Sequence, residues 1–170
     1  MKKLSTAQKG SPRFGEAGFT LIELLVVIGI LAVLLSIVLV AINPARQFAQ
    51  GRDTQRTSNL NSILNAVGQR MADNKGVFAG SFTINLVTYT CPTIPTAIDG
   101  VDSAAGGTGV DLSCLVPTYI PTLPSDPSGG LTAPDTGYQI YVESATGRVH
   151  VVAPVLEPSI PRDTPMTIIR

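Results

Sequence analysis

Residues 18–42 decide the fold, and they read GFTLIELLVVIGILAVLLSIVLVAI. From Leu24 to Ile42 the stretch runs for 19 residues without a charge, and Ser36 is its single polar side chain. An α-helix of this length spans roughly 28 Å, close to the hydrocarbon core of a bilayer at about 30 Å. The apolar region of a secretory signal peptide is shorter, on the order of 7–15 residues. The stretch therefore predicts one membrane-spanning helix.

Charge is distributed as unevenly as hydrophobicity. Residues 1–18 contain four basic side chains and one acidic one, whereas the remaining 152 residues contain eight basic and eleven acidic ones. A short basic segment before an apolar run is typical of a segment delivered to a membrane. The positive-inside rule then places the N-terminus in the cytoplasm. The overall balance of twelve basic against twelve acidic residues excludes a strongly basic nucleic-acid-binding protein.

The helix is predicted to continue beyond the membrane. Apolar residues recur there at i, i+3, i+4, i+7 and i+11, the spacing of one helix face; they are Leu60, Ile63, Leu64, Val67 and Met71. We expect one long helix from Phe19 to Ala72, with a membrane-spanning first part over 19–42 and an amphipathic continuation over 43–72. Pro44 should kink this helix, because its ring removes a backbone hydrogen bond and crowds the preceding turn.

The rest of the chain has the composition of a small β-rich head. Residues 73–170 hold eleven of the thirteen prolines and ten of the sixteen glycines. Residues 77–90 are typical of a broken strand and residues 96–111 of a loop, whereas 138–143 and 148–153 predict a β-hairpin.

A hairpin alone is only marginally stable. We therefore expect a small antiparallel sheet packed on the apolar helix face, within a head over residues 73–153. The tail, residues 154–170, has four prolines and no periodicity, which predicts an extended or disordered segment. The predicted fold class is α+β.

Glu23 is the one carboxylate at the edge of the spanning run. An acidic side chain inside a membrane helix costs about 2.5–3.5 kcal/mol on insertion scales, and such residues usually have a functional partner. The alternative is a hydrated glutamate at headgroup level, and the residue type alone does not separate the two.

The hexapeptide GFTLIE, residues 18–23, resembles the type III signal sequence of type IV pilins and of the pseudopilins of type II secretion. The resemblance covers residues 18–56 well. In that family a prepilin peptidase removes a short basic leader after its terminal glycine, which is Gly18 here. The new N-terminal residue, here Phe19, is methylated on its amine. The glutamate at the fifth mature position, here Glu23, is needed for assembly.

The resemblance implies a structural subunit rather than an enzyme. It implies a single-pass inner-membrane prepilin that polymerises into a type IV pilus-like filament, extracellular or periplasmic. The implied partners are identical or related pilin subunits, the prepilin peptidase, an inner-membrane assembly platform and an ATPase motor. A pseudopilin of type II secretion or of DNA uptake is the alternative within the family, and nucleic acid would be a partner only in DNA uptake. A membrane-anchored binding module that never polymerises is the alternative from a different class.

Residues 119–127 and 137–141 resemble the Leu-Pro-x-Asp-Pro and Gly-Tyr-x-Tyr pattern of many pseudopilins and small pilins. In the major pseudopilins that loop binds calcium, for which Asp126 and Asp135 are the candidate carboxylates here. The alternative is an Asp-Pro turn without a metal. Apart from this calcium, no cofactor or metal is expected. The glycine-rich segment offers a second calcium possibility at Asp99, Asp102 and Asp111, for which acidic residues of a solvated loop are the favoured alternative.

Cys91 and Cys114 are the only cysteines, and both lie in the exported head. A pair beyond the membrane can oxidise, and closing this loop would stabilise the head by about 3.5 kcal/mol. Two free thiols are the alternative. Two cysteines and the distant His150 do not make a zinc site, and His150 between two valines of a predicted strand is expected to be structural. No residue is nominated as catalytic.

Overall fold

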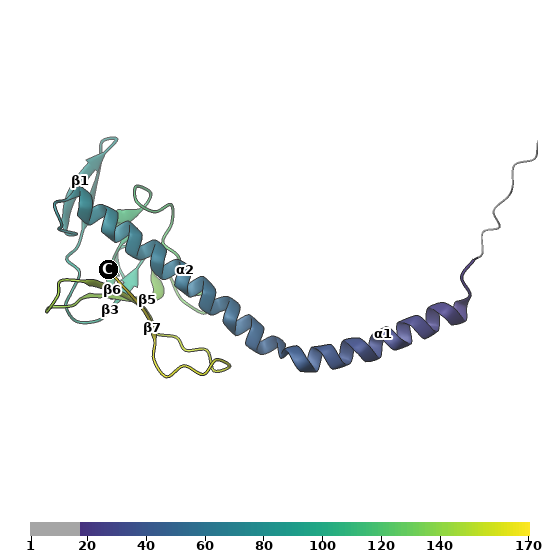
Figure 1. The fold of residues 1–170 in the computed structure, drawn as a ribbon. Coiled ribbons are helices and arrows are strands. Elements are labelled where there is room, and N and C mark those ends of the chain that lie inside the picture. The colour runs from purple at the N-terminus through teal and green to yellow at the C-terminus, as the bar shows by residue number, and fades with distance from the viewer. Residues whose placement is uncertain (1–17) are drawn as a thin grey trace, which may run out of the picture. The chain divides into compact units, whose positions relative to one another are not determined.

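The computed structural model of the protein describes residues 18–170 and divides the chain into two compact units, one ending at Asn43 and the other covering Pro44–Arg170. The predicted leader, residues 1–18, lies outside the described residues apart from Gly18. Helix α1 (Leu21–Ile42) belongs to the first unit, and helix α2 (Pro44–Asp73) begins the second (Figure 1).

The head follows α2 and contains seven strands and one short 3-10 helix among the described residues. They are β1 (Gly80–Ile84), β2 (Val87–Cys91), β3 (Asp99–Asp102), β4 (Val110–Asp111), η1 (Ser113–Leu115), β5 (Asp135–Val142), β6 (Val149–Ala153) and β7 (Met166–Ile169). Two helices are followed by a head made mainly of strands, which confirms the predicted α+β class.

The two helices are separated at Asn43. Its backbone adopts a φ of 47°, in the left-handed region, and Pro44 is the first residue of α2. A proline ring disfavours the helical conformation for the residue before it, and asparagine adopts the left-handed region more readily than most residues. Proline suits the first position of a helix, because it has no N–H to leave unpaired. Where the sequence predicts one helix from Phe19 to Ala72 with a kink near Pro44, the structure thus has two helices.

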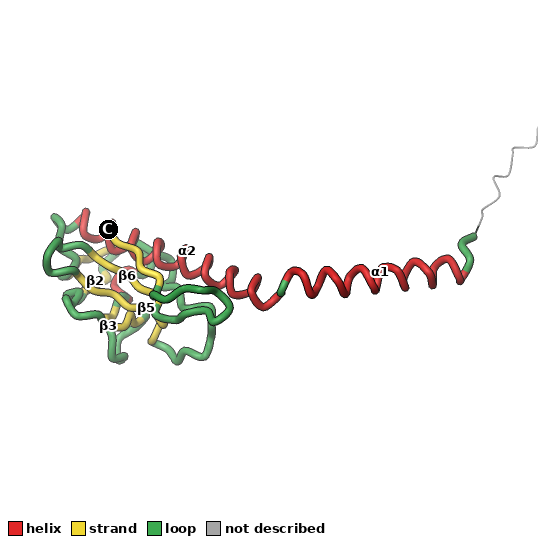
Figure 2. The backbone as a smooth tube through the Cα atoms, turned by 60° about the horizontal axis from the view of Figure 1, so that its bottom comes forward, coloured by secondary structure: helices red, strands yellow, loops and turns green. Residues whose placement is uncertain are grey.

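The buried face of α2 is the predicted one. Leu60, Ile63, Leu64 and Val67 are buried, and Met71 is partly buried against the same core. The helix lies across one face of the head's larger sheet and packs on β6 and β7 (Figure 2). All five residues of β6 are buried, as expected for a strand inside a sheet and under a helix.

The larger sheet has five strands in the order β4-β3-β5-β6-β7. Its β5 and β6 form the predicted hairpin, in which Val142 pairs with Val149. The prediction of a loop over residues 96–111 is wrong, because β3 and β4 lie there and pair in parallel. Val101 and Val110 are buried in the core, although each stands among residues typical of turns. Residues 99–102 form a strand because they pair with β5, which is distant in sequence.

The tail also differs from its prediction of an extended or disordered segment. Strand β7, residues Met166–Ile169, pairs antiparallel with β6, and Arg170 exchanges two backbone hydrogen bonds with Val149. The apolar β6 would otherwise be an edge strand with unpaired backbone groups, and β7 covers that edge. Local composition did not reveal this pairing, because the four prolines of the tail dominate the segment before β7.

A separate hairpin is formed by β1 and β2, where the sequence predicts one broken strand. Asn85 and Leu86 connect the strands with φ values of 50° and 67°. Positive φ at both positions is the geometry that favours Asn-Gly in a two-residue turn. Leu86 is 98% exposed, so no packing offsets its backbone conformation.

Replacing Leu86 with glycine is expected to stabilise the head. The left-handed conformation costs a residue with a Cβ about 1–2 kcal/mol, and the larger entropy loss of glycine offsets about 0.5–1 kcal/mol of that. The expected net gain is thus about 0.5–1 kcal/mol, measured by thermal unfolding of the full chain in detergent. Leu86→Ala is the control, because it removes the exposed side chain but keeps the conformational cost. A loss of stability in Leu86→Gly would show that the turn is not strained.

Candidate functional site

The start of α1 is organised by a reciprocal pair, Thr20 and Glu23. The Thr20 hydroxyl accepts a hydrogen bond from the Glu23 backbone N–H at 3.3 Å, and Glu23 Oε2 accepts one from the Thr20 backbone N–H at 2.9 Å. The Thr20 hydroxyl also donates to Glu23 Oε2 at 2.7 Å. This is a capping box, which satisfies N–H groups that a helix start leaves without partners. It fixes the beginning of the helix at Leu21.

The capping box leaves the predicted processing site outside the helix. Gly18 and Phe19 precede the cap and have no helical structure, and Phe19 is 82% exposed. Chain neighbours aside, a Cβ at Gly18 would meet no atom of residues 18–170 within 4 Å. The Gly18–Phe19 peptide bond is therefore exposed and not held in a helix, as a protease substrate must be. Thr20 was missed as a site residue, although its Thr-x-x-Glu spacing is a recognised helix-start pattern.

Apart from Glu23 and Ser36, the residues of α1 are apolar, and none of its residues is buried. Among residues 18–170 it is the one helix long and apolar enough to cross a membrane. The hydroxyl of Ser36 donates to the carbonyl oxygen of Val33 at 2.7 Å. The single polar side chain of the apolar run is thereby satisfied inside its own helix, so it places no unpaired polar group in lipid.

A second organised cluster lies in the head around Arg56, whose side chain is fully buried. Its Nε and Nη2 donate to the two carboxylate oxygens of Asp126, at 2.7 and 3.1 Å. Its Nη1 donates to Glu157 at 2.7 Å and to Asp53 at 3.0 Å. Because a guanidinium presents five N–H donors in a planar fork, it can serve three carboxylates at once.

Two further arginines complete this cluster. Arg52 forms two hydrogen bonds with Glu157, and Arg162 lies 3.0 Å from an oxygen of Asp53. Three positive groups therefore face three negative ones. We call these six residues the Arg56 cluster: Arg52, Asp53, Arg56, Asp126, Glu157 and Arg162.

The cluster shifts the pKa values of its carboxyl groups. Hydrogen bonds from Arg52 lower the pKa of Glu157 to about 2, and those from Arg56 add to the effect. Burial raises the pKa of Asp126, but hydrogen bonds from Arg56 and Ser128 outweigh burial and hold this pKa below its usual range. Both carboxylates are therefore charged over the whole neutral range.

Of the two residues nominated for calcium, Asp126 is already paired with a cation. Both oxygens of Asp126 accept hydrogen bonds from the buried Arg56 guanidinium, so a divalent cation there would lie against a positive charge. Asp135 accepts a hydrogen bond from the backbone N–H of Gly137 at 2.8 Å. Each acid of the glycine-rich segment likewise accepts from a backbone N–H: Asp99 from Gly100, Asp102 from Gly109 and Asp111 from Ser113. Within residues 18–170, no three potential His, Cys, Asp or Glu ligands gather into a metal site.

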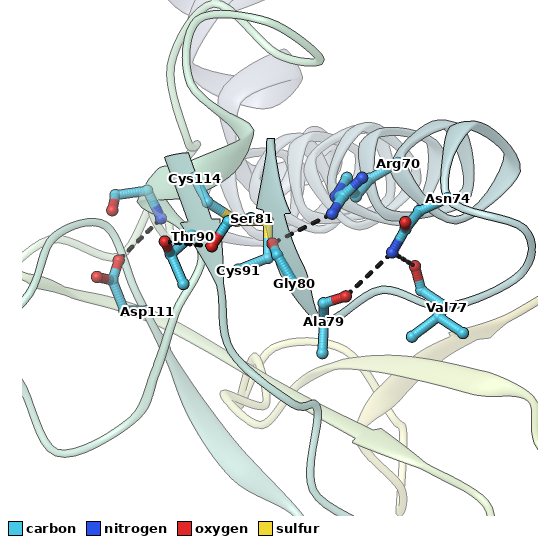
Figure 3. The surroundings of a disulfide bond; sticks show 11 residues. Arg70, Asn74, Val77, Ala79, Gly80, Ser81, Thr90, Cys91, Asp111 and Cys114 are labelled. Atoms are coloured by element: carbon cyan, nitrogen blue, oxygen red, sulfur yellow. Dashed lines mark hydrogen bonds between the residues drawn. A yellow bond between two sulfur atoms is a disulfide. The ribbon is translucent and has the colours of Figure 1, made fainter. Parts of the chain in front are cut away.

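Cys91 and Cys114 are joined as a disulfide in the structure, with their Cα atoms 5.3 Å apart (Figure 3). The bond links the end of β2 to η1. Beside it, Arg70 donates to the carbonyl oxygen of Gly80 at 3.1 Å, which fastens the same hairpin to α2. His150 lies in β6, where its Nδ1 is 3.0 Å from the Tyr141 hydroxyl and its ring stacks on that tyrosine. The structural role expected for His150 stays a prediction.

Oxidation of the two cysteines in the exported protein is a prediction that gel mobility can test. The intact chain should migrate faster without reductant than with it, and Cys114→Ser should destabilise the head by about 2–5 kcal/mol. The Cys91→Ser, Cys114→Ser double variant is the control, because it should be no less stable than the single variant. Two thiols that react with an alkylating reagent in the native exported chain would contradict the prediction.

Comparison with known families gives a match that lies near the N-terminus. Residues 13–39 match the family described as the prokaryotic N-terminal methylation motif. The match contains Gly18, Phe19, the capping box and most of α1. No curated protein and no solved structure matches the chain. The chain therefore carries the N-terminal signal that is found in type IV pilins and pseudopilins.

Proposed function

We propose that this protein is a structural subunit that is cut after Gly18, methylated on the amine of Phe19 and polymerised into a type IV pilus-like filament. The observation that carries the proposal is the methylation motif at residues 13–39, joined to a helix whose apolar surface is wholly exposed. A subunit of this kind performs no catalysis. Its chemistry is supplied by a prepilin peptidase, and its movement by an assembly platform and an ATPase motor.

The apolar surface of α1 needs a covering in each state of the protein. The 22 residues of the helix would leave their side chains in water if the chain were free in solution. In the precursor the covering is the inner membrane, with the N-terminus in the cytoplasm. In the filament the covering is the same helix of neighbouring subunits, with the heads outside. Packing between these helices favours the filament through van der Waals contacts, because lipid already keeps the same apolar surface away from water before assembly.

Glu23 has a different partner before and after processing. In the precursor its carboxylate is bound by the Thr20 cap. Cleavage after Gly18 creates a positively charged amine at Phe19, close to the start of the helix. Glu23 can pair with the amine of its own chain or with that of a neighbour in the filament. Since apolar contacts are not directional, this charge pair is what sets the axial register of neighbouring helices.

The processing step can be tested by mass spectrometry of the membrane or filament form. The expected chain begins at Phe19 and carries one methyl group on its amine. The reason is that Gly18–Phe19 lies outside the helix and before an intact membrane anchor. Gly18→Leu should accumulate as the unprocessed precursor, with Gly29→Ala as a control that is processed normally. A mature chain that begins at Met1, or beyond Ile42, would contradict the proposal.

A further inference from the structure

Three segments that are far apart in the sequence meet at Arg56. Asp53 lies on the same helix, Asp126 lies 70 residues later and Glu157 lies 101 residues later. The Arg56 side chain is fully buried, and the side chains of Asp126 and Glu157 are nearly so. These contacts hold the loop at Asp126 and the tail at Glu157 against α2.

The groups that face Arg56 are all oxygens of the kind that bind a hard cation. Three carboxylates accept its hydrogen bonds, and the Ser128 hydroxyl lies 2.5 Å from Nη2. Carboxylates and neutral oxygens are also the ligands that Ca²⁺ takes in proteins. At the centre of these oxygens a guanidinium supplies one positive charge and five hydrogen-bond donors, so no free ion is needed.

The loop at Asp126 is already closed without a ligand. The backbone N–H of Ser128 donates to Asp126 Oδ1 at 2.9 Å, and the backbone N–H of Asp126 donates to Thr136 at 2.9 Å. Gly137 packs so closely that an added Cβ would lie 3.0 Å from that of Asp126. With Arg52 and Arg162, the positive and negative groups are equal in number. An added divalent cation would unbalance the cluster and repel a buried charge.

We propose that the Arg56 guanidinium is a built-in cation, which joins these three carboxylates as a bound divalent ion would and makes the head independent of divalent ions. It holds the Asp126 loop and the Glu157 tail to α2 as a metal would. The proposal concerns the head alone, so it stands or fails separately from filament formation.

The experiment is thermal unfolding of the processed full-length chain in detergent, with excess chelator or with millimolar CaCl₂. The unmodified chain is expected to unfold at the same temperature in both solutions. Arg56→Ala should unfold at a lower temperature in chelator, because Asp126 then loses its ion-pair partner and the three carboxylates lose the guanidinium that they share. It should regain part of the loss in CaCl₂, since the carboxylates can close around the ion once the guanidinium no longer holds them apart. Isothermal titration with CaCl₂ should give heat with Arg56→Ala only.

Arg52→Ala is the matched control. Arg52 also binds Glu157, but its side chain is partly exposed and it makes no hydrogen bond to Asp126. This variant should remain insensitive to CaCl₂. If Arg56→Ala does not fold, Arg56→Gln takes its place, because it keeps a hydrogen-bond donor but no charge. Stabilisation of the unmodified chain by CaCl₂ would overturn the proposal, and so would a folded Arg56 variant with no response to the ion.

Discussion

Glu23→Leu is expected to be inserted and processed normally and yet to form few or no filaments. In a membrane-anchored protein that does not polymerise, the change removes a carboxylate from apolar surroundings, so membrane insertion should be unaffected or improved. In a filament subunit it leaves the amine of Phe19 without its partner. A buried cation without a partner costs about 3–5 kcal/mol, enough to shift a polymerisation equilibrium more than a hundredfold. Electron microscopy and the yield of sheared filaments measure the effect.

Matched variants separate the charge of Glu23 from its role in the helix cap. Glu23→Gln can still accept the Thr20 hydrogen bonds but carries no charge, so it should fail like Glu23→Leu. Thr20→Ala loses the cap, at about 0.5–2 kcal/mol of helix stability, but keeps the charge and should still assemble. Glu23→Asp should be intermediate, because its shorter side chain keeps the charge. Normal filament yield with Glu23→Leu would mean that the charge pair does not direct assembly.

The second large effect is expected in the head, where Arg56→Leu should lower the free energy of unfolding by about 3–5 kcal/mol at neutral pH. The change leaves the carboxylate of Asp126, 5% exposed as a residue, without its main partner. Arg52→Leu should cost less, because Arg56 still serves Glu157 in that variant. Urea unfolding of the full chain in detergent, with chelator present, measures both. Equal losses in the two variants would contradict a central role for Arg56.

The loss of stability in acid should be smaller in Arg56→Leu than in the unmodified chain. In the unmodified chain the pKa of Glu157 is about 2, against an ordinary value of 4.5, and the pKa of Asp126 is also lowered. A lowered pKa gives stability that is complete above the unfolded value and is lost as the pH falls from about 4.5 towards 2. In Arg56→Leu burial raises the pKa of Asp126, so the contribution of Asp126 should change sign, whereas Arg52 still holds the pKa of Glu157 low. Parallel pH profiles would show that Arg56 does not hold Asp126 ionised.

Patterns that repeat within a few residues could be predicted from the sequence. The apolar stripe from Leu60 to Val67 became the buried face of α2, and the β5–β6 hairpin formed where alternation and Gly147 predicted it. The motif at residues 13–39 could also be recognised from the sequence, because it is a linear pattern of neighbouring residues. Thr20 belongs to the same local class and could have been found from its spacing to Glu23.

The residues that required the tertiary structure have partners far away in the chain. From the sequence Asp126 was interpreted as a metal ligand or a turn residue. Its ion-pair partner Arg56 lies 70 residues earlier, and no local pattern indicates that the two residues meet. The sequence predicted a loop where β3 lies and an extended tail where β7 lies. Both strands are short, and each forms only because it pairs with a strand that is distant in sequence or joined by a long connection. The sequence by itself determined the membrane helix, its processing signal and the helix face that the head covers. The tertiary structure alone decided which buried charges pair, since a buried ion needs a partner in space and can find it anywhere along the chain.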